Sequence, residues 1–92
     1  MTEEENQGNV IPGIKAADLV QYIASQLVTE PDTIFIENEQ IDDNKIKLTI
    51  ESHPDDVGRL IGKKGYVIRS IRRLARAAGA QEDVIVDVEV AG

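Results

Sequence analysis

Residues 57–78 read VGRLIGKKGYVIRSIRRLARAA and dominate both the charge distribution and the expected fold of this chain. This stretch has no acidic residue and holds seven of the ten basic ones: Arg59, Lys63, Lys64, Arg69, Arg72, Arg73 and Arg76. The rest of the chain has three basic residues against 17 acidic ones, a formal charge of −14. Because exposed charges are screened beyond about 8 Å at physiological salt, the acidic remainder does not cancel this segment. We therefore expect one localised anion-binding site on an otherwise acidic protein.

The sequence Gly62-Lys63-Lys64-Gly65 at the centre of this stretch predicts a tight turn between two helices. A short apolar helix is expected to end at Gly62, and a second helix to begin near Tyr66. Such a turn offers backbone N–H groups, the positive end of a helix and two cations, all of which favour a phosphate. Glycines at both ends remove Cβ atoms where a sugar–phosphate backbone would approach the main chain.

The second helix has two different faces when it is placed on a wheel of about 100° per residue. Its arginines fall on one side at spacing i, i+3, i+4, i+7, and its apolar residues fall on the other: Val67, Ile68, Ile71, Leu74, Ala75 and Ala78. The apolar side predicts packing against a core. The arginines could contact a nucleic acid, a partner protein or only solvent, and the sequence leaves these three alternatives open. Gly79 is expected to cap the C-terminal end of the helix.

The residues before this stretch predict a helix and a β-hairpin. Apolar residues at steps of three and four predict an amphipathic helix over residues 15–28, which Pro31 should terminate. Residues 33–38 and the strictly alternating residues 45–51 predict two antiparallel strands joined by a turn at 42–44. Ser52 is expected to begin the short helix that runs to about Ile61.

Residues 84–90 alternate again and predict a third strand with four valines on one face. The expected fold is therefore α+β, in the order αββααβ, with a three-stranded mixed sheet covered on one face by three helices. Residues 1–13 are acidic and polar and are expected to form a flexible tail, and residues 14–92 a single domain. Without cysteine, signal peptide or long apolar run, the chain is expected to be cytoplasmic, with no metal and no cofactor.

The pattern I-G-K-K-G-x-x-I-x-x-I, set between two helices and after a two-stranded unit, resembles the KH (K-homology) domain. The element order resembles the bacterial type II arrangement, and the small size resembles the short single-KH proteins of the KhpA type. The resemblance covers roughly residues 16–90. It implies a phosphate clamp at the glycine loop and an apolar groove for bases beside it, floored by residues such as Val57, Leu60, Ile61 and Ile68. The implied RNA-binding residues are Val57, Arg59, Ile61, Gly62, Lys63, Lys64, Gly65, Tyr66, Ile68 and Arg69.

This resemblance implies a non-enzymatic protein that binds single-stranded RNA, as a post-transcriptional regulator or RNA chaperone. It also implies pairing, either as a homodimer or as a heterodimer with a larger KH-containing Jag-type protein. Tyr66 beside the loop could stack on a base or pack across the helix start. His53 has no nucleophile or metal-ligand cluster around it in sequence, and we expect no catalytic role for it.

Three other classes of protein compete with this interpretation: a P-loop protein, a DNA-binding helix-turn-helix protein and a protein–protein interaction module. A P-loop is excluded because three residues separate Gly58 from Gly62 instead of four, and Lys64 stands where a Ser or Thr should hold magnesium. A DNA-binding helix-turn-helix protein would need Asn, Gln or Ser toward base edges, whereas the second helix offers mainly arginines and aliphatic residues. A protein–protein interaction module that docks through the basic helix face remains an alternative.

Overall fold

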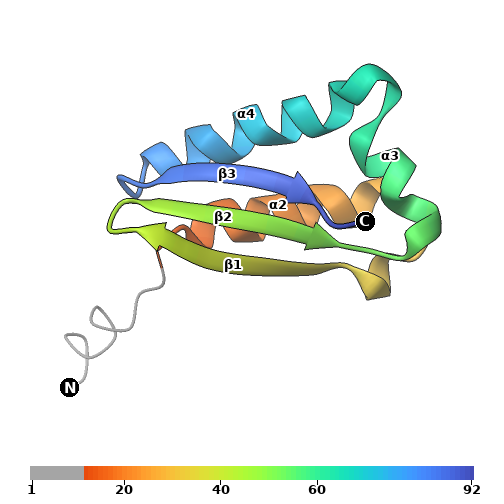
Figure 1. Cartoon of the computed structure of the whole chain (residues 1–92), viewed down its shortest axis with the longest axis horizontal. Coiled ribbons are helices and arrows are strands. Elements are labelled where there is room, and N and C mark those ends of the chain that lie inside the picture. Colours follow the sequence, from red (N-terminus) through yellow and green to blue (C-terminus); the bar gives the residue numbers. More distant parts are fainter. Residues whose placement is uncertain (1–11) are drawn as a thin grey trace.

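The computed structural model describes residues 12–92, and the predicted order αββααβ is confirmed (Figure 1). The helices and strands are α2 (Ile14–Leu27), β1 (Phe35–Asp42), β2 (Lys45–Glu51), α3 (Val57–Ile61), α4 (Tyr66–Ala80) and β3 (Ile85–Val90). Short 3-10 turns lie at Pro31–Thr33, Pro54–Asp56 and Lys63–Gly65. Apart from Pro12 and Gly13, the predicted acidic tail lies outside the described residues.

The three strands form one mixed sheet in the order β1-β2-β3. β1 and β2 form the predicted antiparallel hairpin, with Ile36 opposite Ile50 and Gln40 opposite Ile46. β1 is longer than predicted, because it continues through the polar residues up to Asp42. β3 runs parallel to β2 and lies at the edge of the sheet. The return through α3 and α4 is the long crossover that a parallel pair requires.

The core lies between the sheet and the helices, which all cover one face of it (Figure 1). The even-numbered residues of β2 and β3 point into this core, and the odd-numbered residues lie on the open face, as their alternation predicted. Among residues 12–92, fourteen hydrophobic residues are buried: Ala16, Val20, Ala24, Ile34, Ile46, Leu48, Ile50, Leu60, Ile68, Ile71, Ala75, Val84, Val86 and Val88. Full burial of one such large side chain contributes about 1.5–3 kcal/mol, so this single layer holds the helices on the sheet.

Gly79 does not cap α4, and that prediction is wrong. The helix continues to Ala80, and Gly79 is buried inside its last turn. A Cβ atom at Gly79 would collide with the Val86 side chain and would lie 2.7 Å from the carbonyl oxygen of Val84. Gly79 therefore allows α4 to pack closely against β3. The left-handed residue of this connection is Asp83, with φ 57°.

The predicted role of Ser52 at the start of α3 is also wrong. Its hydroxyl donates to the carbonyl of His53 at 3.1 Å, and the turn begins instead at His53. There the imidazole Nδ1 accepts the N–H of Asp55 at 3.1 Å. The histidine thus has a local capping role. None of the helices among residues 12–92 combines the length and the apolar character needed to cross a membrane.

Candidate nucleic-acid interface

The loop Gly62–Gly65, here called the GKKG loop, joins α3 to α4 at one end of the molecule (Figure 1). Gly62, Lys64 and Gly65 all have positive φ, at 76°, 56° and 76°. A left-handed conformation costs a residue with a Cβ about 1–2 kcal/mol, so Lys64 carries strain that the glycines on either side avoid. The N–H of Gly62 donates to Gly58, that of Gly65 to Gly62, and that of Tyr66 to Lys63. None of these three bonds uses the N–H of Lys63 or Lys64.

The two glycines of the loop are needed for different reasons. A Cβ atom at Gly62 would collide with the side chain of Val67 and lie 2.9 Å from its backbone nitrogen. A Cβ atom at Gly65 would meet nothing closer than the guanidinium of Arg69 at 3.5 Å. Gly62 therefore allows the loop to fold back against α4, whereas Gly65 serves only the left-handed turn and leaves space above the backbone.

A buried carboxylate anchors the helix that leads into the loop. Asp56 is completely buried and accepts hydrogen bonds from three donors: the backbone N–H of Thr29 at 3.0 Å, its hydroxyl at 2.9 and 3.1 Å, and the N–H of Glu30 at 3.1 Å. The Thr29 N–H, followed by the other donors and by the Arg59 guanidinium 3.4 Å away, holds the pKa of Asp56 below its ordinary value despite burial. Asp56 thus connects the end of α2 to the start of α3 and orients Arg59. The sequence predicted a helix start between Ser52 and Ile61 but did not indicate that Asp56 would be a buried anchor.

The basic residues of this surface differ in whether a carboxylate is nearby. Among residues 12–92, Arg59 is paired with Asp56, and Arg76 lies 3.7 Å from Asp87. Within the described part of the chain, no carboxylate lies within 4 Å of the other five: Lys63, Lys64, Arg69, Arg72 and Arg73. Their charges are therefore available to a bound anion.

The arginines of α4 do not form one uniform stripe. The guanidinium of Arg69 lies 4.9 Å from the ring centre of Tyr66 and close to Gly65, so it belongs to the loop. Arg72 donates its Nε–H to the carbonyl oxygen of Val88 at 2.8 Å, at the outer edge of β3. Arg76 approaches β3 through Asp87. Two of the four arginines therefore contact the edge strand, a role that was not among the three alternatives considered from sequence.

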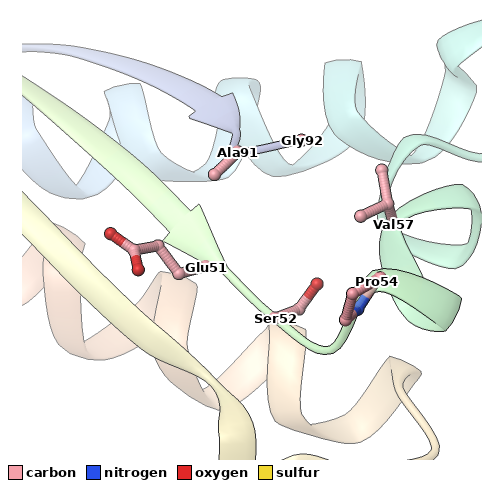
Figure 2. A pocket seen from close by; sticks show the side chains of 6 residues that line it. All are labelled: Glu51, Ser52, Pro54, Val57, Ala91 and Gly92. Atoms are coloured by element: carbon pink, nitrogen blue, oxygen red, sulfur yellow. The ribbon is translucent and has the colours of Figure 1, made fainter.

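The hydrophobic residues expected to floor the groove are divided between core and surface. Leu60 and Ile68 are buried, at 0% and 6% exposure, and belong to the core. Ile61 is 38% exposed beside the loop. Val57 is half-buried and faces Ala91 and Gly92 across an opening of about 400 Å³ at the end of β2 and β3 (Figure 2). The side chains that a ligand could reach near the loop are thus Val57 and Ile61.

Tyr66 is 58% exposed and lies on a different surface from Val57. Together with side chains of α2 and α4 it lines an apolar depression of about 320 Å³, here called the helix groove: Ile23, Leu27, Tyr66, Val67, Ser70, Ile71 and Leu74. Leu74, predicted to face the core, is 50% exposed in this groove. The molecule therefore offers a basic surface along the loop, α4 and β3, and a separate apolar surface between α2 and α4.

This chain is similar to several known proteins. RNA-binding protein KhpA of Clostridium perfringens is 36% identical over 73 residues, which cover 79% of this chain and 96% of that protein. RNA-binding protein KhpA of Bacillus subtilis is 38% identical over 73 residues, with coverage of 79% and 89%. A crystal structure of Era from Aquifex aeolicus superposes with a TM-score of 0.57 and 27% identity, covering 82% of this chain.

The match to Era involves only part of that larger protein, since it covers 29% of the Aquifex aeolicus Era chain. A second structure, Era in complex with MgGDPNP and nucleotides 1506–1542 of 16S ribosomal RNA, matches with a TM-score of 0.55 and 28% identity. The family model described as "KhpA/KhpB, KH domain" matches residues 17–90, from within α2 to the end of β3. Because that match and the curated relatives cover most of its length, this chain belongs to the KhpA/KhpB family of KH-domain proteins.

Proposed function

We propose that this protein binds single-stranded RNA by holding the sugar–phosphate backbone on the GKKG loop, and acts in the cytoplasm as a post-transcriptional regulator or RNA chaperone without catalysing a reaction. The observation that carries this proposal is the loop itself. It combines positive φ at both glycines with two exposed lysines that have no carboxylate partner among residues 12–92. The names of the KhpA relatives and the RNA in one Era complex point to the same ligand.

In this mechanism Lys63 and Lys64 meet non-bridging phosphate oxygens as point charges, and Arg69 adds a third cation beside Gly65. The half-buried Val57 and the exposed Ile61 would contact bases on the other side of the loop. The site is organised before RNA arrives, because Gly62 fixes the loop against α4 and Asp56 fixes α3 against α2. Less ordering is then required on binding.

The helix-turn-helix alternative is disfavoured by the surroundings of α4. A recognition helix must enter the major groove of DNA and needs a free, projecting face. In this protein α4 is flanked by α2 on one side and by β3 on the other, and Arg72 and Arg76 are both directed to β3. Duplex DNA is therefore a poor fit.

The direct test is the double variant Lys63→Asp with Lys64→Asp. A pair of charges 4 Å apart is worth about 1 kcal/mol in water, and the double replacement changes four units of charge. We expect a loss of RNA affinity of about a hundredfold or more, with unchanged circular dichroism because both side chains are exposed. Titrations with single-stranded RNA and with duplex DNA measure it. Binding of single-stranded RNA at wild-type affinity by the folded variant would refute the proposal.

We also propose that the protein pairs with another KH domain, either a second copy or a larger Jag-type protein, and the helix groove supports this. An exposed apolar depression is typical of an interaction surface, and this one lies away from the edge of β3. Leu74→Asp, at a half-exposed position, should leave the fold intact and weaken pairing at least tenfold, because it places an unpaired charge in the interface. Sedimentation of wild type and variant tests this, and a wild-type monomer without a KH partner would contradict it.

A further inference from the structure

The contact between Arg72 and Val88 fixes a guanidinium at the open edge of β3. Among residues 12–92, β3 pairs only with β2: the N–H of Ile85 donates to Asn44, just before β2, and the N–H of Ala91 donates to Ile50. Val88 lies an odd number of residues from both, so its backbone groups point away from β2. Its carbonyl oxygen accepts the Nε–H of Arg72 at 2.8 Å.

This bond uses one donor of Arg72 and leaves the others free. A guanidinium has five N–H donors in a rigid plane. The bond to Val88 uses the Nε–H, so it leaves the N–H groups of the two terminal nitrogens, Nη1 and Nη2, for another acceptor. Arg72 is half-buried, and no carboxylate lies within ion-pair distance of it among residues 12–92. The fork is thus held in place without being neutralised.

The space beside Arg72 is a polar pocket of about 260 Å³, here called the edge pocket, lined by Lys47, Arg72, Arg76, Asp87, Val88 and Glu89. The other two cations in it are already paired: Arg76 with Asp87 at 3.7 Å, and Lys47 with Glu89 at 3.4 Å. Arg72 is therefore the cation in this pocket that remains for a ligand.

We propose that Arg72 reads a nucleobase at the edge pocket and favours guanine over adenine. This inference rests on the proposed binding of single-stranded RNA. Guanine presents two adjacent acceptors, O6 and N7, that match the two parallel donors of an arginine fork, whereas adenine presents one acceptor and one donor there. A fork already fixed by Val88 loses little further freedom when it binds such an edge.

Position along α4 separates Arg72 from the phosphate-binding residues. It lies six residues after Tyr66, about 9 Å along the helix axis, while Lys63, Lys64 and Arg69 gather at the loop. A base whose own or neighbouring phosphate is held at the loop can therefore extend toward the edge pocket. The two kinds of contact predict different behaviour, since phosphate contacts affect all sequences alike and base contacts affect one.

The experiment uses short oligouridine RNAs that carry a single guanine or a single adenine at a varied position. Wild type should bind the best guanine-containing RNA more tightly than its adenine counterpart, by about fivefold to a hundredfold, the value of one bidentate contact. Arg72→Ala should lose this preference. Arg72→Lys should reduce it, because an ammonium can still donate to guanine O6 or N7 but lacks the planar fork and the Nε bond to Val88, and it should keep more of the overall affinity because it keeps the charge.

Arg73→Ala is the matched control. It removes one positive charge from the next residue of the same helix, at an exposed position that makes no hydrogen bond or ion pair with β3 among residues 12–92, and should weaken all RNAs equally. Thermal unfolding of each variant tests whether Arg72 only covers the exposed edge of β3, since loss of such a covering role would lower the melting temperature without changing the guanine preference.

Each outcome bears on one of the two proposals. If wild type binds no single-stranded RNA, the proposed function fails. If it binds RNA without preferring guanine, or if Arg72→Ala keeps the preference in a folded protein, the reading role of Arg72 is wrong and the loop clamp still stands.

Discussion

Two regions of this protein, the open face of the sheet and the surroundings of the GKKG loop, differ in whether their cations are paired with carboxylates. On the open face of the sheet, Lys45 lies 3.9 Å from Asp87, and Lys47 lies between Glu39 at 3.9 Å and Glu89 at 3.4 Å. Around the GKKG loop, no carboxylate of the described residues lies within 4 Å of Lys63, Lys64 or Arg69. Exposed pairs add at most about 1 kcal/mol to stability, so their main effect is to neutralise local charge.

This difference explains how an acidic protein can present a focused basic site. The formal net charge of −7 counts every residue of the sequence, whereas the local charge differs between the sheet face, whose lysines are paired, and the loop, whose cations have no carboxylate partner among residues 12–92. An anion responds to the local field within a Debye length of about 8 Å. Under the proposed mechanism, RNA affinity should therefore depend on the cations beside the loop more than on the net charge of the chain.

The largest effect should come from breaking the loop that presents these cations. Gly62→Ala must displace Val67 and adopt a positive φ, so we expect it to destabilise the fold by more than about 1–2 kcal/mol and to lose detectable RNA binding. Gly65→Ala faces only the conformational cost, because nothing lies within 3.4 Å of the added Cβ atom. Urea unfolding and RNA titration of both variants measure this. Equal effects of the two substitutions would show that close packing against Val67 is unimportant.

A smaller effect is expected on the salt dependence of RNA binding, which should differ between loss of the loop lysines and loss of the sheet-face lysines. We expect log K for single-stranded RNA to fall with log salt at a slope of about −2 to −3.5, if three to five phosphates are neutralised. Replacing Lys63 and Lys64 by Gln should reduce this slope by about 1.4. Replacing Lys45 and Lys47 by Gln removes the same charge from the sheet face and should leave the slope unchanged. If the sheet-face variant changed the slope as much as the loop variant, RNA would be responding to net charge rather than to the loop.

The smallest effect on RNA affinity at neutral pH is expected from substitution of Asp56, the buried carboxylate that holds α3 against the end of α2. The pKa of Asp56 is lowered in the folded state, so its contribution to stability is present above the ordinary aspartate value of about 3.9 and is lost as pH falls toward the lowered value. Asp56→Asn should therefore flatten the loss of stability in acid, measured by urea unfolding across that range. Asp55→Asn, at the exposed neighbouring carboxylate, is the control and should change the pH dependence little. If both variants reduced the pH dependence of stability equally, Asp56 would have no special part in the acid sensitivity of the fold.

The sequence by itself determined most of the local structure. The alternation of residues 45–51 and 84–90 predicted two strands with one buried face, and Ile46, Leu48, Val86 and Val88 are buried accordingly. The glycine spacing around Lys63 and Lys64 predicted the loop and the helix boundaries on both sides. These predictions succeeded because periodicity and turn chemistry act between residues that are close in sequence.

Only the tertiary structure decided which groups are paired across the fold. Asp56 receives its hydrogen bonds from residues 26 and 27 positions earlier, and Arg72 bonds a carbonyl 16 positions later. Gly79 has the sequence signature of a cap, but the approach of β3 gives it a packing role instead. Hydrogen bonds and close contacts depend on atoms within a few ångströms in space. The sequence placed seven basic residues in one segment, and the fold determined which of them remain free for RNA.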